Sequence, residues 1–268
     1  MAKQLLKSFS FIITALALLT FSSGVAFAAK PAASAPAPPT GNDISWPQCN
    51  KTLPKGQAFG VVGVNGGLAN NTNPCLATQL AWANQSKGGT GQPLVSLYVN
   101  TANPGLTGSW WPSSNDYAGT TIVSPYGTCD GTDTAACAYI YGYAKAYDDA
   151  TIRGVSNPAS YLWWLDVETI NSWEANTAAN AADLEGMTAY FQSIGARVGL
   201  YSTSYQWGKI VGKVSSDSNL NNLQSWIPGA RSAASAKTNC SLAPLTAGSP
   251  VTLTQYVSSN LDYDVSCT

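Results

Sequence analysis

The sequence predicts an α/β fold, a modified TIM-like (β/α) barrel in a single domain, and three observations support this. Short apolar or alternating runs, which are typical of strands, recur along the chain. Helical patterns lie between them, and strands that alternate with helices run parallel and are joined by crossovers. Residues 42–268 suit one barrel of about 250 residues. An open sheet stays the alternative, because no glycine-rich phosphate loop decides between the two.

The strands and helices are expected at defined places. A first strand begins at Asp43, and six further segments have the strand pattern: 59–65, 94–100, 161–168, 197–203, 223–227 and 251–257. The clearest helical spacing covers 180–194, where Gly195 supplies the stop, and a second helix covers about 138–152.

Residues 102–137 have no clear periodicity and predict a long loop over one rim of the barrel. The loop contains the pair Trp110 and Trp111. These rings either stack on sugars or fix the loop to the body of the domain, and the sequence favours neither role over the other.

The N-terminal segments predict export. Lys3 and Lys7 precede an apolar run over 9–19 and a small-residue cleavage site at 26–28, so residues 1–28 read as a signal peptide. A retained membrane anchor is the weaker alternative, because hydroxyl residues interrupt the apolar stretch. Residues 29–41 are almost all Ala, Pro, Ser and Gly and predict a linker. We expect a secreted, extracellular monomer, in some settings associated with the cell wall, with no membrane contact after cleavage.

Composition excludes several classes of function. Only 10% of the residues are charged, and Lys and Arg form no cluster, so a nucleic-acid or anionic-membrane partner is not expected. The chain contains no histidine, which removes Ser-His-Asp and Cys-His catalysis and the usual zinc sites. Carboxylates are then the natural general acids and bases near neutral pH. No cofactor and no metal are expected.

Six cysteines in an exported chain predict disulfides rather than a metal site. We pair Cys129 with Cys137, which lie close together in one loop. Cys49 with Cys75, and Cys240 with Cys267, are the candidate pairs between adjacent loops, and the sequence leaves other pairings open.

The candidate chemistry centres on Asp166 and Glu168. In a strand, residues two apart point the same way, so these two acids share one face of 161–168 and precede a turn, where β/α barrels place catalytic residues. Two carboxyls this close should titrate as a coupled pair, with one proton held above its usual pKa. The alternative is that Asp166 caps the next segment, while Glu168 is solvated or pairs with Arg197. Glu174 and Glu185 are interpreted as surface residues.

Further acids flank the domain. Asp43 lies in the first strand, and Asp262 and Asp264 are expected to follow the last one. In a closed barrel these ends are neighbours, so the acids could line the same mouth as Asp166 and Glu168. The alternatives are turn or cap aspartates, or a calcium site at Asp262 and Asp264, for which the spacing alone is too weak.

A series of motifs along the chain resembles a known family. The motifs are Asp43-Ile44-Ser45, Leu165-Asp166-Val167-Glu168, Val198-Gly199-Leu200-Tyr201-Ser202, Leu223 to Ile227, and Thr254-Gln255-Tyr256 followed by Asp262. In this order they resemble glycoside hydrolase family 25, the Chalaropsis-type lysozymes. They are most similar to the uncharacterised glycoside-hydrolase-like relatives of that family in secreted actinobacterial proteins.

The resemblance implies a modified β/α barrel that cleaves the β-1,4 bond between N-acetylmuramic acid and N-acetylglucosamine in peptidoglycan. By this resemblance, Glu168 is the general acid, and Asp166 stabilises the 2-acetamido group in a substrate-assisted step. Asp43 and Asp262 match the two remaining acids. Val64-Asn65-Gly66-Gly67 replaces the family's Lys-Ala-Thr-Glu-Gly, and Tyr98-Val99-Asn100 replaces its Tyr-His-Phe. These departures concern the muramidase specificity more than the glycosidase class.

The expected partner is peptidoglycan or another wall polysaccharide. Candidate sugar-contacting residues are Trp46, Tyr98, Asn100, Tyr201, Trp226 and Tyr256. The alternatives are a glycosidase of another polysaccharide, or a non-catalytic wall- or glycan-binding barrel that keeps the acids as a structural network.

Overall fold

A computed structural model describes residues 39–268, and the predicted signal peptide lies outside this range. Most of the predicted linker lies outside it too. The first strand begins at Thr40, so the last two residues assigned to the linker, Thr40 and Gly41, belong to the barrel. The boundary was placed too late because both residues also fit the small-residue composition of the linker.

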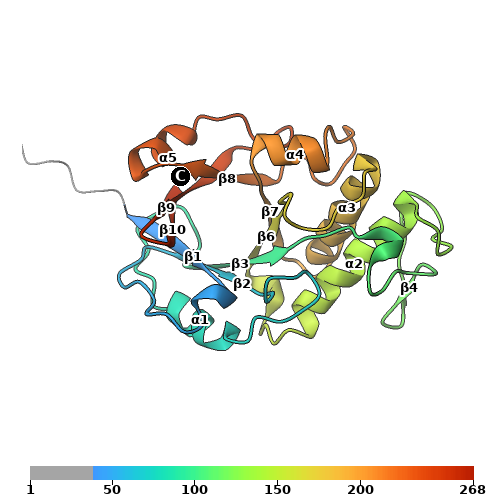
Figure 1. The fold of residues 1–268 in the computed structure, drawn as a ribbon, viewed down its shortest axis with the longest axis horizontal. Helices are drawn as coiled ribbons and strands as arrows, with labels where there is room; N and C mark the ends of the chain where they lie inside the picture. Colours follow the sequence, from blue (N-terminus) through green and yellow to red (C-terminus); the bar gives the residue numbers. More distant parts are fainter. Residues whose placement is uncertain (1–38) are drawn as a thin grey trace, which may run out of the picture. The chain divides into compact units, whose positions relative to one another are not determined.

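Eight strands close a barrel in the order β1-β10-β9-β8-β7-β6-β3-β2 (Figure 1). Their bounds are β1 Thr40–Ile44, β2 Gly60–Gly63, β3 Val95–Asn100, β6 Leu162–Asp166, β7 Arg197–Tyr201, β8 Gln224–Ala230, β9 Val251–Ser258 and β10 Leu261–Ser266. The closed barrel is thus confirmed, and each of the six segments predicted as further strands overlaps one, although β8 and β9 extend beyond their segments.

The barrel is mixed, whereas an all-parallel sheet was expected. Strands β1, β2, β3, β6, β7, β8 and β9 form parallel neighbours, but β10 pairs antiparallel with both β9 and β1. The turn between β9 and β10 is short. It contains Ser259 and Asn260, both with positive φ (52° and 60°), as tight hairpin turns require. Asp262 and Asp264 therefore lie inside the last strand and do not follow it.

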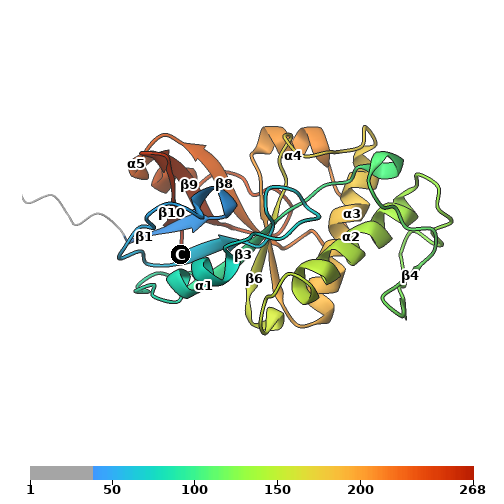
Figure 2. The ribbon, with the colours of Figure 1, turned by 60° about the horizontal axis from the view of Figure 1, so that its bottom comes forward.

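Five α-helices surround the described barrel: α1 Leu76–Ala83, α2 Ala135–Thr151, α3 Thr177–Ser193, α4 Ser204–Ile210 and α5 Ala233–Asn239. Both predicted helices are present, as α2 and α3. Local signals fix where α3 begins, because the Asn176 side chain accepts from the backbone N–H groups of Ala178 and Ala179. Helices α2 and α3 lie side by side on one flank of the barrel (Figures 1 and 2). None of the helices in residues 39–268 has the length and apolar character needed to cross a bilayer.

Strand β6 separates two apolar layers, as its alternation predicts. Trp163 and Leu165 pack outward beneath the helices, and the Trp163 ring stacks on Phe191 of α3 at 4.5 Å between centroids. Trp164 packs inside the barrel and contacts the Trp226 ring edge-on at 5.6 Å. The inward face of β6 ends in Asp166, so the same alternation that builds the core points the acid into the barrel.

The segment 102–137 has more structure than a loop over the rim. It contains the turn Gly105–Thr107 and a hairpin of β4 (Asp116–Tyr117) and β5 (Thr120–Thr121), and it lies beside α2 (Figure 2). The Trp110 and Trp111 rings stack on Tyr141 of α2, at 5.8 and 5.3 Å between centroids. These tryptophans fix the segment to the domain.

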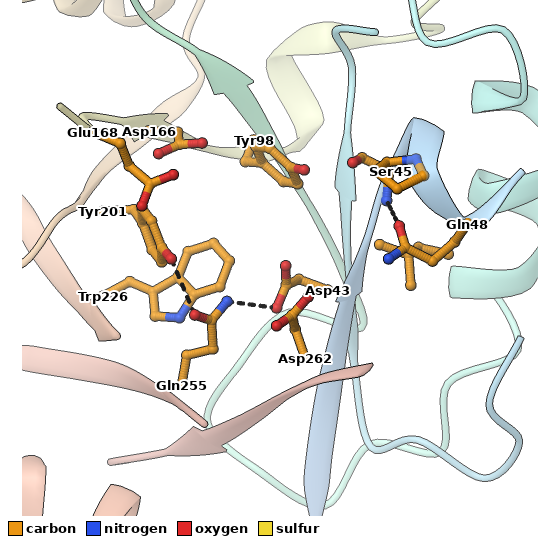
Figure 3. A pocket seen from close by; sticks show the side chains of 12 residues that line it. Asp43, Ser45, Gln48, Tyr98, Asp166, Glu168, Tyr201, Trp226, Gln255 and Asp262 are labelled. Atoms are coloured by element: carbon orange, nitrogen blue, oxygen red, sulfur yellow. Dashed lines mark hydrogen bonds between the residues drawn. The ribbon is translucent and has the colours of Figure 1, made fainter. Parts of the chain in front are cut away.

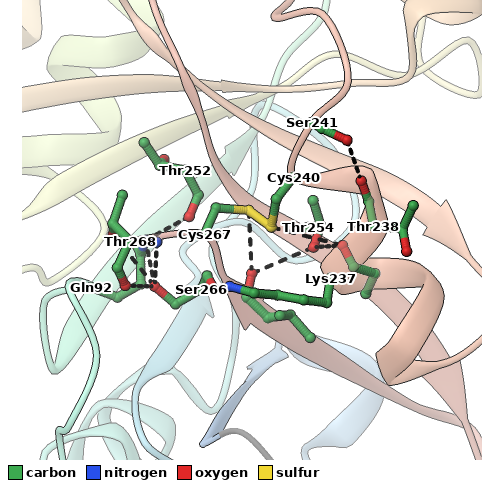
Figure 4. The surroundings of a disulfide bond; sticks show 12 residues. Gln92, Lys237, Thr238, Cys240, Ser241, Thr252, Thr254, Ser266, Cys267 and Thr268 are labelled. Carbon is green, nitrogen blue, oxygen red and sulfur yellow. Dashed lines mark hydrogen bonds between the residues drawn. A yellow bond between two sulfur atoms is a disulfide. The ribbon is translucent and has the colours of Figure 1, made fainter.

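Three disulfides join the predicted pairs: Cys49–Cys75, Cys129–Cys137 and Cys240–Cys267. The last of these ties the end of α5 to the chain that follows β10 (Figure 4). Next to this disulfide, the backbone carbonyl of Ser266, the last residue of β10, accepts a hydrogen bond from Lys237 of α5 at 3.4 Å. The closing strand of the barrel is thus held covalently from outside.

Candidate active site

A cavity of about 220 Å³ opens at the carboxyl ends of the parallel strands (Figure 3). It is lined by Asp43, Ile44, Ser45, Pro47, Gln48, Tyr98, Asp166, Glu168, Tyr201, Trp226, Gln255 and Asp262. The four acids predicted from the sequence, Asp43, Asp166, Glu168 and Asp262, all lie in this one cavity.

Asp166 is the buried member of the central pair. It ends β6 with 7% of its surface exposed, and its Oδ1 atom has no hydrogen-bond partner among the described residues. Burial, then the neighbouring carboxyls of Glu168 and Asp43, raises the pKa of Asp166 well above its usual value. A raised pKa, as expected for one member of the pair, is thus found at Asp166.

Glu168 lies two residues further on, half-buried and directed into the cavity (Figure 3). Gln206 of α4 donates from Nε2 to Glu168 Oε1 at 3.4 Å. The Oε1 atom of Gln206 accepts in turn from the backbone N–H of Thr169 at 2.6 Å. Arg197 begins β7, at the strand end away from the cavity, and among residues 39–268 it forms no ion pair with Glu168.

Asp43 and Asp262 face the pair from the other side of the cavity, where they are opposite each other in the β1–β10 register. Burial, then the charge of Asp262, raises the pKa of Asp43 to about 7. Burial, then the charge of Glu168, raises the pKa of Asp262. Among the described residues, no lysine or arginine lines the cavity, so mutual repulsion of the carboxyls adds to burial in raising the pKa values of Asp43, Asp166 and Asp262.

Gln255 of β9 connects the two sides of the cavity, and it was not predicted as a site residue. Its Nε2 donates to Asp43 Oδ2 at 2.9 Å, while its Oε1 accepts from the Tyr201 hydroxyl at 3.0 Å (Figure 3). The signal was present in the sequence: Gln255 is two residues from Leu253, which packs inside the barrel, so both share the inward face of β9.

Ser45 and Gln48 form a further part of the wall that was not predicted. Gln48 Oε1 accepts from the Ser45 backbone N–H at 2.9 Å, and this contact begins the short helix Trp46–Gln48. Gln79 of α1 donates to the Ser45 carbonyl at 2.6 Å. These contacts fix the turn that follows Asp43.

Three of the candidate sugar-contacting residues line the cavity: Tyr98, Tyr201 and Trp226. The Trp226 ring contacts Tyr201 edge-on at 4.5 Å between centroids and is only 2% exposed, so it supports the wall.

The other three candidates lie outside the cavity. Trp46 is 48% exposed on the rim beside it. The Asn100 backbone N–H donates to Asn65 Oδ1 at the end of β3. Tyr256 lies on the outward face of β9 and stacks on Tyr263 at 5.3 Å, because Gln255 takes the inward position.

The prediction that Glu185 is a surface residue is wrong. It is 7% exposed in α3, where it accepts hydrogen bonds from the hydroxyls of Tyr126 and Ser218. Within residues 39–268, no group of His, Cys, Asp and Glu is arranged to hold a metal ion, so the structure adds no support for a calcium site at Asp262 and Asp264.

Comparison with sequence families and curated proteins finds lysozyme-like relatives. The family model described as Lysozyme-like protein 1 matches residues 145–238. Lysozyme-like protein 5 of Caenorhabditis elegans is 38% identical over 78 residues, which cover 29% of this chain and 35% of that protein. Probable GH family 25 lysozyme 4 of Dictyostelium discoideum is 41% identical over 49 residues, which cover 18% of this chain and 22% of that protein. The match thus spans about a third or less of each curated relative.

Solved structures extend the likeness to most of the chain. A bacterial lysozyme from Streptomyces coelicolor has a TM-score of 0.51 at 15% identity, covering 87% of this chain and 94% of that one. A muramidase from Trichobolus zukalii has a TM-score of 0.50 at 17% identity, covering 85% of this chain and 92% of that one. At these identities the likeness shows the fold. The predicted resemblance to family 25 lysozymes is confirmed, and special closeness to actinobacterial relatives stays a prediction.

Proposed function

We propose that this protein is a secreted glycoside hydrolase that cleaves β-1,4 bonds of peptidoglycan, as an N-acetylmuramidase does. The observation that carries the proposal is the convergence of Asp43, Asp166, Glu168 and Asp262 in one cavity of a histidine-free chain. Glycosidases use carboxyl groups to donate and accept protons at the scissile bond. The lysozyme-like relatives and the shared fold support the same class.

Glu168 is proposed as the general acid. Its carboxyl reaches the cavity from the turn after β6 and accepts a hydrogen bond from Gln206, whose own side chain is held by the backbone N–H of Thr169. A proton donor must be within hydrogen-bond reach of the leaving oxygen, so its orientation matters as much as its acidity. The contact with Gln206 supplies that orientation without placing a positive charge beside the acid.

Asp166 is proposed to stabilise the 2-acetamido group of the substrate. In a substrate-assisted step the acetamido oxygen attacks the anomeric carbon, and positive charge develops at the amide N–H. The unpartnered Oδ1 of Asp166 is a free acceptor for that N–H. The neutral carboxyl in the free protein becomes better able to ionise as this positive charge develops beside it.

The test compares wild type with Glu168→Gln on purified cell walls, by loss of turbidity and release of reducing sugar. Glutamine keeps the size of the side chain but cannot donate the acid's proton, so we expect the rate to fall by about 10²–10⁴. Glu174→Gln is the matched control, because Glu174 lies outside the cavity lining. Equal activity in wild type and Glu168→Gln, or none in either, would contradict the proposal. Wall binding without sugar release in both would favour the non-catalytic alternative.

A further inference from the structure

Asn180 of α3 has a fully buried polar side chain that lies outside the lining of the cavity. A side-chain amide can form four hydrogen bonds, two as donor and two as acceptor, and Asn180 forms all four. Its Nδ2 atom donates to the backbone carbonyls of Glu174 at 2.8 Å and Ile210 at 2.9 Å. Its Oδ1 atom accepts from the Glu174 backbone N–H at 3.2 Å and from Asn103 Nδ2 at 3.1 Å. One buried amide therefore joins three separate segments of the chain.

The two bonds to the Glu174 backbone fix the segment that runs from Glu168 to α3. Trp173, the residue before Glu174, donates from its indole Nε1 to the Glu168 backbone carbonyl at 2.8 Å. The Asn103 backbone N–H holds the same segment, because it donates to the Ser172 carbonyl at 2.9 Å. The backbone that carries Glu168 is thus bonded to the structure on both of its sides.

The bond to Ile210 fixes helix α4. Ile210 is the last residue of α4, and the final carbonyls of a helix have no partner within the helix, so Asn180 satisfies one of them. The same helix carries Gln206, which donates to Glu168 Oε1 at 3.4 Å. The Gln206 Oε1 atom accepts from the backbone N–H of Thr169 at 2.6 Å and from its hydroxyl at 2.9 Å.

The Glu168 carboxyl and its partner Gln206 thus come from two elements that meet at Asn180. Their contact of 3.4 Å is longer than the usual N–H···O range of about 2.7–3.2 Å, so a small displacement of either element would break it. Packing of α3 against α4 does not by itself require a polar residue, since burying an amide is unfavourable unless its hydrogen bonds are made. The four bonds of Asn180 indicate a requirement for fixed backbone positions.

We propose that Asn180 is a positioning residue, which sets the place of Gln206 relative to the Glu168 carboxyl by bonding α4 and the segment after β6 at one amide. The effect on catalysis rests on the proposed hydrolase function, whereas the effect on the position of Gln206 does not. Asn180 acts through these two elements, because it lies outside the cavity.

The kinetic test is a double-mutant cycle between Asn180→Ala and Gln206→Leu, measured by sugar release from purified cell walls. We expect each single variant to lower kcat about tenfold with KM little changed, because Glu168 loses its fixed orientation. The two substitutions disrupt the same contact, so the double variant should lose only about ten- to thirtyfold in kcat. A loss of about a hundredfold, the product of the two single losses, would overturn the proposal. Wild-type kcat in Asn180→Ala would overturn it too.

Asn219→Ala is the matched control. The Asn219 Nδ2 atom also donates to a backbone carbonyl, that of Glu185 of α3 at 2.9 Å, outside the cavity. The variant should keep kcat within about twofold of wild type, because this bond joins neither of the elements that carry Glu168 and Gln206. An equal fall in kcat in Asn219→Ala would show that any loosened contact of α3 slows the reaction, which would overturn the proposal.

Folding of the variants is checked before the kinetics. If Asn180→Ala does not fold, Asn180→Ser, which keeps one donor and one acceptor, takes its place in the cycle with the same expected result. Loss of the fold in both variants would assign Asn180 to stability alone and overturn the proposal.

Hydrogen exchange measured by NMR reports on Gln206 without any substrate. Thr169 is exposed, so protection of its backbone N–H depends on the bond to Gln206 Oε1. We expect this N–H to exchange about tenfold faster in Asn180→Ala. The Val167 N–H, which donates to the Tyr201 carbonyl of β7 at 2.9 Å, should keep its rate. An unchanged rate at Thr169, or equal acceleration at both positions, would overturn the proposal.

The two proposals fail in different ways. If wild type releases no sugar, the hydrolase proposal fails, while hydrogen exchange still decides whether Asn180 places Gln206. If wild type is active but the two substitutions act independently, the positioning proposal fails and the hydrolase proposal stands.

Discussion

The substitution Gln255→Leu removes the connection between the two sides of the cavity. Gln255 is 7% exposed, and its two hydrogen bonds hold the Tyr201 hydroxyl and Asp43 Oδ2. Leucine has a similar size but satisfies neither partner. Each buried group left unpaired costs about 1–3 kcal/mol, and added apolar burial offsets about 1–2 kcal/mol of the total. We therefore expect the free energy of unfolding to fall by about 2–3 kcal/mol, within limits of about 0–5 kcal/mol.

Urea unfolding at pH 5 measures this loss, and wall hydrolysis measures its effect on the site. The activity should fall about tenfold or more, because Asp43 and Tyr201 lose their fixed orientation. Gln224→Leu is the matched control: Gln224 Oε1 accepts from Thr252 at 2.9 Å, outside the cavity. It should leave kcat unchanged. A Gln255→Leu protein with wild-type activity, and stability within about 0.5 kcal/mol, would refute the reasoning.

Three further predictions concern pH, the rim and the helix pair. An acid whose pKa is raised by folding stabilises the protein at low pH, and this contribution is lost as pH rises from the pKa of the unfolded chain toward that of the folded state. Folding raises the pKa of Asp43 to about 7 and those of Asp166 and Asp183 well above their usual value, so Tm should fall as pH rises from about 4 to 7. Asp183→Asn should flatten this slope, and a Tm that rises over the range would be inconsistent with it. Trp46→Ala should raise KM for long glycans about fivefold with kcat unchanged, because an exposed ring on the rim contributes about 1 kcal/mol of stacking. A loss confined to kcat would argue against this rim contact. Gly142→Ala should destabilise the fold by about 3 kcal/mol or more, because the alanine Cβ would overlap the Asp183 carbonyl oxygen where α2 and α3 pack. An unchanged urea midpoint would show that the helices can separate without cost.

Apolar alternation made most of the barrel predictable. The strand expected at 161–168 is present as β6, Leu162–Asp166, because apolar side chains occupy both of its layers. Strand β10 was missed because its inward positions hold Asp262 and Asp264, which break the apolar pattern. The residues opposite these acids come from β1 and β9, and neighbours so distant along the chain leave no local signal.

The candidate site shows the same division between local and tertiary information. The four acids of the cavity could be selected from the sequence because histidine is absent and acids are few. The outward orientation of the Tyr256 side chain could not be predicted, because it depends on the register of β9. Glu185 was misplaced because its partner Tyr126 comes from the segment 102–137, whose path along α2 no periodicity reveals. The cysteine pairs were predictable because each links neighbouring loops.

The central claim is that Glu168 drives cleavage of the bond between N-acetylmuramic acid and N-acetylglucosamine. The most direct measurement digests purified peptidoglycan, reduces the new chain ends with borohydride and quantifies the reduced sugars after hydrolysis. Wild type should produce reduced muramic acid, and Glu168→Gln should produce less by about 10² or more. Reduced glucosamine in its place would contradict the bond assignment, and equal yields from both proteins would contradict the role of Glu168.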